Sequence, residues 1–167
     1  MRTNNNQRKV PKVYLIDDDP VVTYLLVDLV ESVNLPHVVF DSAVKFLEQD
    51  LSGLEGCIVT DLRMPGLDGF AVLEALRTRQ PDLPVIVLTG HGDVPLAVAA
   101  LKHGAFDFVE KPCNDNQLVD RVVEALKHDE MLRLAAASAE SINNRLSQLS
   151  MRERQVMERV LAGKLNK

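Results

Sequence analysis

Short apolar runs alternate along the chain with longer segments in which apolar residues recur every three or four positions. The runs have the length and β-branched composition of buried strands, and they lie at residues 13–16, 37–40, 57–60, 85–89 and 106–109. The intervening segments have helical periodicity and begin near residues 20, 43, 68, 93 and 115. Five strands alternating with five helices predict a doubly wound α/β domain, in which helices cover both faces of a five-stranded parallel sheet.

The fifth helix has no clear end in the sequence. Residues 127–145 are rich in Ala, Leu, Glu and Arg and contain no Pro or Gly, so a helical linker is expected. A further helix begins at Ser150, where the motif S-M-R-E places Glu153 for a capping box. The remaining residues are too few to bury a core, so they are expected to be the truncated start of a second domain. The expected organisation is a disordered leader, one full domain, a helical linker and a partial helical segment, at residues 1–11, 12–128, 129–148 and 149–167.

Composition narrows the class of protein. The chain has 167 residues, 46% of them hydrophobic, which is enough for one well-buried core. Its two cysteines, Cys57 and Cys113, have no metal-binding or disulfide spacing, so a reducing compartment fits. No apolar run is long enough to cross a membrane, and no secretory signal precedes the first strand. We therefore expect a cytoplasmic protein without a membrane partner.

Charge is distributed unevenly. Residues 149–167 carry five Lys or Arg against two Glu, a net charge of +3. Because the whole chain carries −5, residues 1–148 carry −8. The main domain is acidic and the C-terminal segment is basic.

Polar side chains follow the predicted strands at their carboxyl ends. Asp17 and Asp18 follow the first strand, Asp61 the third, Thr89 ends the fourth and Lys111 follows the fifth. In an open parallel sheet these ends meet at one edge, where ligands bind. Clustered carboxylates repel one another unless a cation is present, and a site with only oxygen ligands suits Mg²⁺. Asp61, just before the turn at Pro65 and Gly66, is then a candidate nucleophile for phosphoryl transfer.

Each of these residues also has a simpler interpretation. Asp61 can be a helix cap, and the acidic cluster at residues 17–19 can be favoured by a helix macrodipole. Thr89 can merely end its strand and Lys111 can be a solvated loop lysine. His91 lies between two glycines with no other His or Cys nearby, so we expect a loop residue rather than a metal ligand. The joint placement of the set favours the functional interpretation.

Four motifs carry a resemblance to a known family. V-Y-L-I-D-D-D-P, T-D-L-R-M-P-G-L-D-G, V-L-T-G-H-G-D-V-P-L-A-V-A-A-L-K-H-G-A and D-F-V-E-K-P occur in the order and spacing of the CheY-like receiver domain of two-component response regulators, in particular the FixJ/NarL type. The similarity covers about residues 11–130. The final segment, L-S-M-R-E-R-Q-V-M-E-R-V-L-A-G-K-L-N-K, resembles the start of a LuxR-type helix-turn-helix domain, whose recognition helix is not included.

The resemblance implies roles for individual residues. Asp61 matches the phosphoacceptor, while Asp17 and Asp18 match the acidic pair that holds Mg²⁺ together with Asp61 and the main-chain carbonyl of Arg63. The phosphate-binding and switch positions correspond to Thr89, Lys111 and Phe108. A cis peptide bond is implied between Lys111 and Pro112, and Asp19 receives no firm role.

The resemblance also implies partners. A sensor histidine kinase would donate the phosphoryl group, phosphorylation would favour a homodimer, and DNA would be bound only through a complete C-terminal domain. The chain would regulate transcription as a signalling protein rather than an enzyme, with at most an intrinsic autophosphatase activity.

Two other classes of protein remain as alternatives. The run V-Y-L-I-D-D-D-P-V resembles the nucleophile motif of haloacid-dehalogenase-type phosphatases, in which Asp17 would attack and Asp19 would act as acid and base. That interpretation leaves Asp61, Thr89 and Lys111 without a role. A flavodoxin-like cofactor binder would need a Gly-rich or Ser/Thr-rich loop after the first strand, and the sequence has none there.

Overall fold

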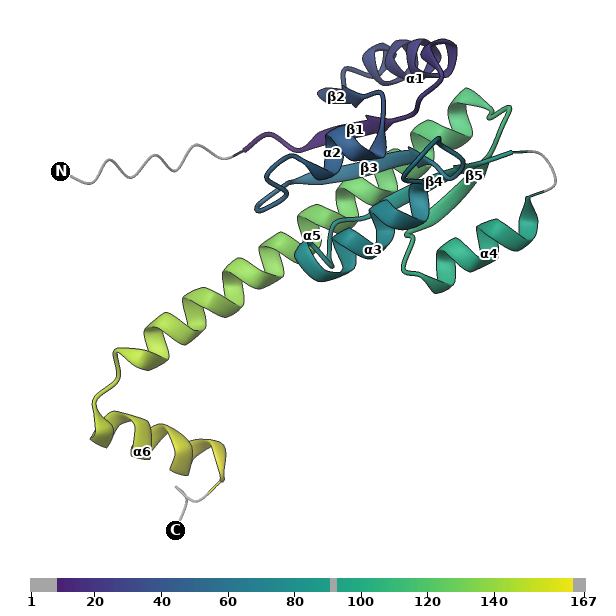
Figure 1. The fold of residues 1–167 in the computed structure, drawn as a ribbon. Helices are drawn as coiled ribbons and strands as arrows, with labels where there is room; N and C mark the ends of the chain where they lie inside the picture. The colour runs from purple at the N-terminus through teal and green to yellow at the C-terminus, as the bar shows by residue number, and fades with distance from the viewer. Residues whose placement is uncertain (1–8, 91–92, 164–167) are drawn as a thin grey trace. The chain divides into compact units, whose positions relative to one another are not determined.

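The sheet of this protein is parallel throughout. The structure is a computed structural model that describes residues 9–90 and 93–163, so most of the predicted leader and His91 lie outside the described residues. The five strands follow the order β2-β1-β3-β4-β5 (Figure 1), with bounds β1 Lys12–Ile16, β2 His37–Phe40, β3 Gly56–Asp61, β4 Val85–Thr89 and β5 Asp107–Glu110. The order reverses between β1 and β3, which is where a doubly wound sheet opens its ligand-binding crevice. The predicted fold class is confirmed.

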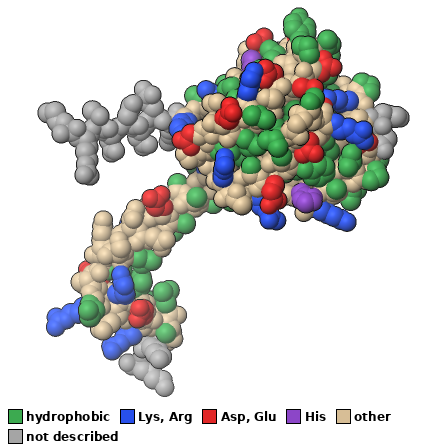
Figure 2. Space-filling view, viewed as in Figure 1, with side chains coloured by type: hydrophobic (Ala, Val, Ile, Leu, Met, Phe, Trp, Pro, Cys, Tyr) green, Lys and Arg blue, Asp and Glu red, His purple; other side chains and the backbone are tan. Residues whose placement is uncertain are grey.

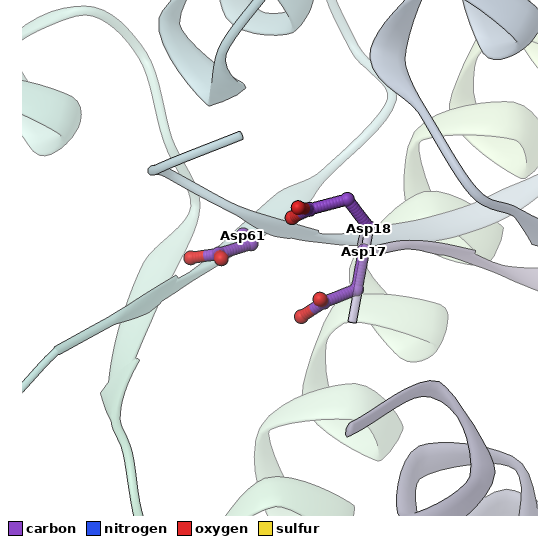
Figure 3. Close-up of side chains that lie close together, drawn as sticks. All are labelled: Asp17, Asp18 and Asp61. Carbon is purple, nitrogen blue, oxygen red and sulfur yellow. The ribbon is translucent and has the colours of Figure 1, made fainter. Parts of the chain in front are cut away.

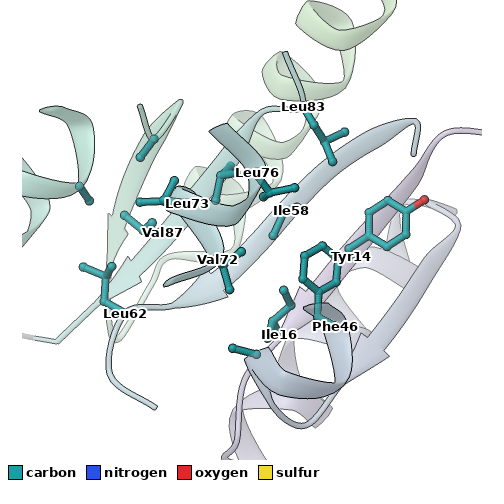
Figure 4. Close-up of a cluster of buried hydrophobic side chains, with 14 of the residues drawn as sticks. Tyr14, Ile16, Phe46, Ile58, Leu62, Val72, Leu73, Leu76, Leu83 and Val87 are labelled. Atoms are coloured by element: carbon teal, nitrogen blue, oxygen red, sulfur yellow. The ribbon is translucent and has the colours of Figure 1, made fainter. Parts of the chain in front are cut away.

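Helices cover both faces of the sheet. Their bounds are α1 Pro20–Ser32, α2 Ala43–Leu47, α3 Gly69–Arg79, α4 Val94–Lys102, α5 Asp115–Ser147 and α6 Met151–Leu161. One buried cluster joins the sheet to α2, α3 and α4 and includes Phe46, Leu73 and Leu76 (Figure 4). A second cluster joins the other face to α1 and α5. The central strands β1, β3 and β4 are buried on both sides, which explains their nearly continuous apolar runs, whereas the edge strands β2 and β5 are mostly half-buried.

Side-chain caps fix where several helices begin. The Asp19 carboxylate accepts a hydrogen bond from the Val21 amide and caps α1, which gives Asp19 a structural role. Asp68 caps α3 in the same way through the Ala71 amide. Because Asp68 fills this position, the alternative in which Asp61 caps the helix is wrong.

The long helix α5 extends from one compact unit into another. Contacts within the chain divide it into a unit up to Glu130 and a unit from Met131 onward. α5 continues without interruption through the segment predicted to be a helical linker, as far as Ser147. The second unit also contains α6, whose predicted capping box between Ser150 and Glu153 is present. In Figure 2 basic side chains gather around this helix, in keeping with the positive charge of the C-terminal segment.

Candidate functional site

Three carboxylates meet where β1 and β3 end. The pairing of Ile16 with Thr60 sets the ends of the two strands level, so Asp17 and Asp18 emerge beside Asp61 (Figure 3). One carboxylate oxygen from each aspartate lies within 4.8 Å of the others. The predicted gathering of these three residues at one sheet edge is therefore present.

Lys111 brings a positive charge into this cluster. Its Nζ lies 2.9 Å from Asp17 Oδ2 and 3.3 Å from Asp61 Oδ2. The Lys111 amide also donates to the Thr89 carbonyl at 2.7 Å, which ties the loop after β5 to the end of β4. Burial lowers the pKa of Lys111, but its hydrogen bond to Asp17 and the two carboxylate charges outweigh this effect and raise the pKa above its ordinary value. The side chain stays an ammonium ion.

The aspartates differ in exposure. The Asp17 side chain is 0% exposed, and its Oδ1 accepts a hydrogen bond from the Asp19 amide at 2.9 Å. Burial raises the pKa of Asp17, and the hydrogen bonds from Lys111 and from the Asp19 amide only partly oppose this effect. The Asp61 side chain is 14% exposed. Asp61 is therefore more open than Asp17 to an incoming group.

Thr89 and Phe108 lie on the neighbouring strands. Thr89 is buried at the end of β4, and Phe108 of β5 pairs with Val87 of β4. The Phe108 ring is half-buried against the cluster that contains α3 and α4, and it lines a cavity of about 440 Å³ with Lys111. The peptide bond between Lys111 and Pro112 is cis, as the resemblance implies.

Two features of the site were missed by the sequence analysis. Gly69 packs so closely on the backbone of β3 that a Cβ atom there would lie 2.6 Å from the Asp61 carbonyl oxygen. The Arg63 guanidinium pairs with Asp93, at the start of α4, at 2.6 Å. The D-G dipeptide after the turn is a sequence signal for the close packing of Gly69. The Arg63–Asp93 pair joins residues 30 positions apart, and no local sequence pattern predicts such a contact. Arg63 thus links the loop after Asp61 to α4.

The donor set fits a divalent cation that prefers oxygen ligands. All three side chains are carboxylates, one of them exposed, and their oxygens are close enough to share one ion. Mg²⁺ is commonly held by one or two carboxylates and retains open positions for water or phosphate. The residues present therefore fit Mg²⁺, and the contribution of the Arg63 carbonyl stays a prediction.

A comparison with known families decides the class of protein. Residues 13–123 match the family model of the response regulator receiver domain. The chain belongs to this family. It is 45% identical over 156 residues to the transcriptional regulatory protein FixJ of Bradyrhizobium diazoefficiens, a match that covers 93% of this chain and 76% of FixJ. It is 38% identical over 155 residues to the response regulator protein TodT of Pseudomonas putida, covering 93% of this chain and 68% of TodT.

Solved structures agree with this assignment. The response regulator StyR superposes with a TM-score of 0.83 at 34% identity, covering 93% of this chain and 78% of StyR. Full-length FixJ from B. japonicum superposes with a TM-score of 0.69 at 44% identity, covering 92% of this chain and 75% of FixJ. The resemblance to FixJ-type response regulators is confirmed, and the haloacid-dehalogenase alternative is not favoured. Among the described residues, no helix is both long and apolar enough to span a membrane.

Proposed function

We propose that Asp61 accepts a phosphoryl group from the phosphohistidine of a sensor histidine kinase. The observation that carries the proposal is the position of Asp61, which is partly exposed, lies beside two further aspartates and contacts the Lys111 ammonium at 3.3 Å. Asp17 and Asp18, with Asp61 and the Arg63 carbonyl, would hold Mg²⁺. When bound, this ion supplies positive charge that offsets the negative charge of the carboxylates and of the phosphoryl oxygens.

The residues of the chain itself have distinct tasks in this transfer. Asp61 attacks the phosphorus in line with the leaving imidazole, so that an acyl phosphate forms and the phosphorus–nitrogen bond breaks. The Lys111 ammonium, held next to the reacting carboxylate, donates hydrogen bonds to a phosphoryl oxygen. Asp17 is too buried to compete as a nucleophile, and its contact with Lys111 keeps the ammonium in place. The chain acts as a signalling protein, and we propose that slow loss of the phosphoryl group proceeds in the same site.

Phosphorylation would be read through Thr89 and Phe108. The phosphoryl group adds charge and acceptor oxygens, so the Thr89 hydroxyl at the end of β4 is drawn toward it. Phe108, already half-buried beside β4, would then turn further inward, changing the surface of α4, β5 and α5. To shift the ratio of the active to the inactive conformation from about 1:99 to 99:1, phosphorylation must favour the active conformation by about 5.5 kcal/mol of free energy. We propose that the altered surface forms a homodimer.

DNA binding is assigned to a complete LuxR-type helix-turn-helix domain, of which α6 would be the first helix. The capping box and basic side chains of α6 support this proposal. Because an isolated basic helix contacts only phosphates, residues 1–167 should bind DNA weakly and lose that binding as salt rises. A titration with promoter and random DNA at near-physiological salt tests this, and a tight sequence-dependent complex would contradict it. As a transcription regulator, the protein is expected in the cytoplasm.

Labelling with a small phosphodonor tests the proposed function. In the presence of Mg²⁺, the protein should form a covalent acyl phosphate that persists after the donor is removed. Asp61→Asn, which preserves shape but removes the nucleophile, should fold normally and take up no label. Rapid donor hydrolysis that survives Asp61→Asn but is abolished by Asp17→Asn would instead indicate a phosphatase.

A further inference from the structure

The part of α5 in the second unit carries an apolar seam. We define the seam as five residues spaced at intervals of 3, 4, 3 and 4 positions, namely Leu132, Ala135, Ala139, Ile142 and Leu146. This spacing has a period of 3.5 residues and corresponds to positions a and d of two heptads. Over two heptads a helix drifts by only about 20° per heptad from this repeat, so all five residues lie on one face of α5.

The middle of the seam is exposed within the described residues, and its two ends are half-buried. Ile142 is 57% exposed, Ala135 and Ala139 are exposed, and Leu132 and Leu146 are half-buried. Nearer the start of α5, by contrast, one stripe of side chains is buried in the first unit. This stripe consists of Leu118, Val122, Ala125 and Asp129. The apolar residues of the seam therefore remain in contact with water, although they have the spacing of an interface.

We propose that the seam pairs in parallel, in register, with the same seam of a second copy of this chain. In such a pair each a or d residue meets its own counterpart, so the pattern is complementary to itself. Ala135 and Ala139 are small and allow the two backbones to approach closely. The inference goes beyond the proposed phosphoryl transfer and would hold whether or not Asp61 is the phosphoacceptor.

The flanking positions do not oppose a parallel pair. In parallel coiled coils a g residue lies beside the e residue five positions later in the partner. Here Met131 would lie beside Ala136, and Ser138 beside Asn143, so no like charges meet. The charged side chains of Arg133 and Glu140 fall outside these positions, and Arg145, at the last g position, has the uncharged Ser150 five positions later, beyond the end of α5. Charge is therefore compatible with pairing between two copies.

Two heptads are short, so the pairing should be weak when it acts alone. The seam is joined directly to the first unit through α5. Any association between two receiver domains would then tether the two seams and raise their effective concentration. The expected behaviour is a dimer that forms with rising protein concentration and strengthens when the receivers associate.

Disulfide trapping tests the orientation and register. In a Cys113→Ser background, which leaves only the fully buried Cys57, Ala135→Cys would place a thiol in the seam. Ala137→Cys places a matched thiol on the opposite side of the same helix. Under mild oxidation, Ala135→Cys should form linked dimers at least tenfold faster than Ala137→Cys. Equal rates would overturn the proposal, because the proposed pair brings residue 135, and not residue 137, next to its own counterpart.

A pair of charge substitutions tests the apolar contact. Ile142→Lys introduces charge into the seam, whereas Leu134→Lys introduces the same charge at a site outside the seam that is 62% exposed. Trapping through Ala135→Cys should fall at least tenfold with Ile142→Lys and remain unchanged with Leu134→Lys. Circular dichroism checks that each variant keeps its helix content. Ile142→Gln, in which Gln has a higher helix propensity than Ile, should give the same loss of trapping. Trapping that survives both Ile142 variants would contradict the proposal. Phosphodonor labelling of Asp61 should be normal in every variant, because the seam lies outside the phosphoryl-transfer site.

Discussion

Lys111 is the cation that Asp17 and Asp61 share among the described residues of the site. Lys111→Met removes this charge while keeping much of the side-chain volume, so it leaves the buried Asp17 carboxylate without its partner. Without Mg²⁺, we expect the free energy of unfolding to fall by about 1–3 kcal/mol. With saturating Mg²⁺ the deficit should shrink, because the ion replaces the lost positive charge.

Urea unfolding with and without Mg²⁺ measures both effects of the Lys111 substitution. Lys102→Met, at an exposed position on α4, serves as the control and should cost little in either condition. An equal deficit for Lys111→Met in both conditions would show that Lys111 and the ion do not act on the same carboxylates.

Cys57 gives the protein a pH dependence that can be assigned to one side chain. Burial in β3 raises the pKa of this thiol to about 12 from its ordinary value of 9.0. The folded state therefore keeps the proton that the unfolded state loses above pH 9, so stability falls as pH rises from about 9 to 12. Between pH 9 and pH 10.5 the loss is about 2 kcal/mol, from about 1.4 kcal/mol per pH unit.

Cys57→Ala isolates this contribution. The variant starts less stable because it leaves a small cavity, but its free energy of unfolding should decline less steeply with pH. The Cys113 thiol, Tyr14 and Lys111, whose pKa values are also raised, titrate in both proteins and therefore largely cancel in the comparison. Parallel curves for the two proteins between pH 8 and pH 10.5 would rule out the assigned role of the thiol.

At the scale of elements, Asp129 joins α5 to the beginning of β3. Its Oδ2 accepts a hydrogen bond from the Gly56 amide at 2.9 Å, and Asp129 as a whole is 5% exposed. Asp129→Ala would leave the Gly56 amide buried without this acceptor, at a cost of about 1–3 kcal/mol. Asp129→Asn keeps an acceptor oxygen and should cost less.

Chemical denaturation and hydrogen exchange at the Gly56 amide report on this contact. Exchange should accelerate in Asp129→Ala and stay near the wild-type rate in Asp129→Asn. Asp120→Ala, at an exposed position of the same helix, should change neither quantity. Identical losses for Asp129→Ala and Asp129→Asn would mean that the Gly56 bond contributes no measurable stability.

Local sequence patterns predict the helices and strands well, because hydrophobic periodicity and turn residues are local properties of the sequence. The buried run before Asp61 and the turn at Pro65 are sufficient to place the carboxylate at a strand end. The contacts of Arg63 with Asp93 and of Asp129 with Gly56 join residues 30 and 73 positions apart. Such contacts depend on tertiary packing, so no helical or strand periodicity reports them.

At the scale of the whole molecule, the sequence predicts the site through topology. Once β1 and β3 are known to be parallel neighbours, Asp17, Asp18 and Asp61 must emerge at one edge. What the pattern does not give is the difference in burial that separates Asp61 from Asp17. That difference arises where Lys111, the Asp19 amide and Thr23 at the start of α1 contact Asp17.

The identity of the phosphorylated residue is the most direct test of this account. After phosphorylation with Mg²⁺ and a small phosphodonor, borohydride reduces an acyl phosphate to an alcohol and converts the modified aspartate into homoserine. Peptide mapping by mass spectrometry then locates that residue. We predict homoserine at position 61 alone, and none in the Asp61→Asn variant. Homoserine at position 17 or 18, or label that persists in Asp61→Asn, would contradict the account.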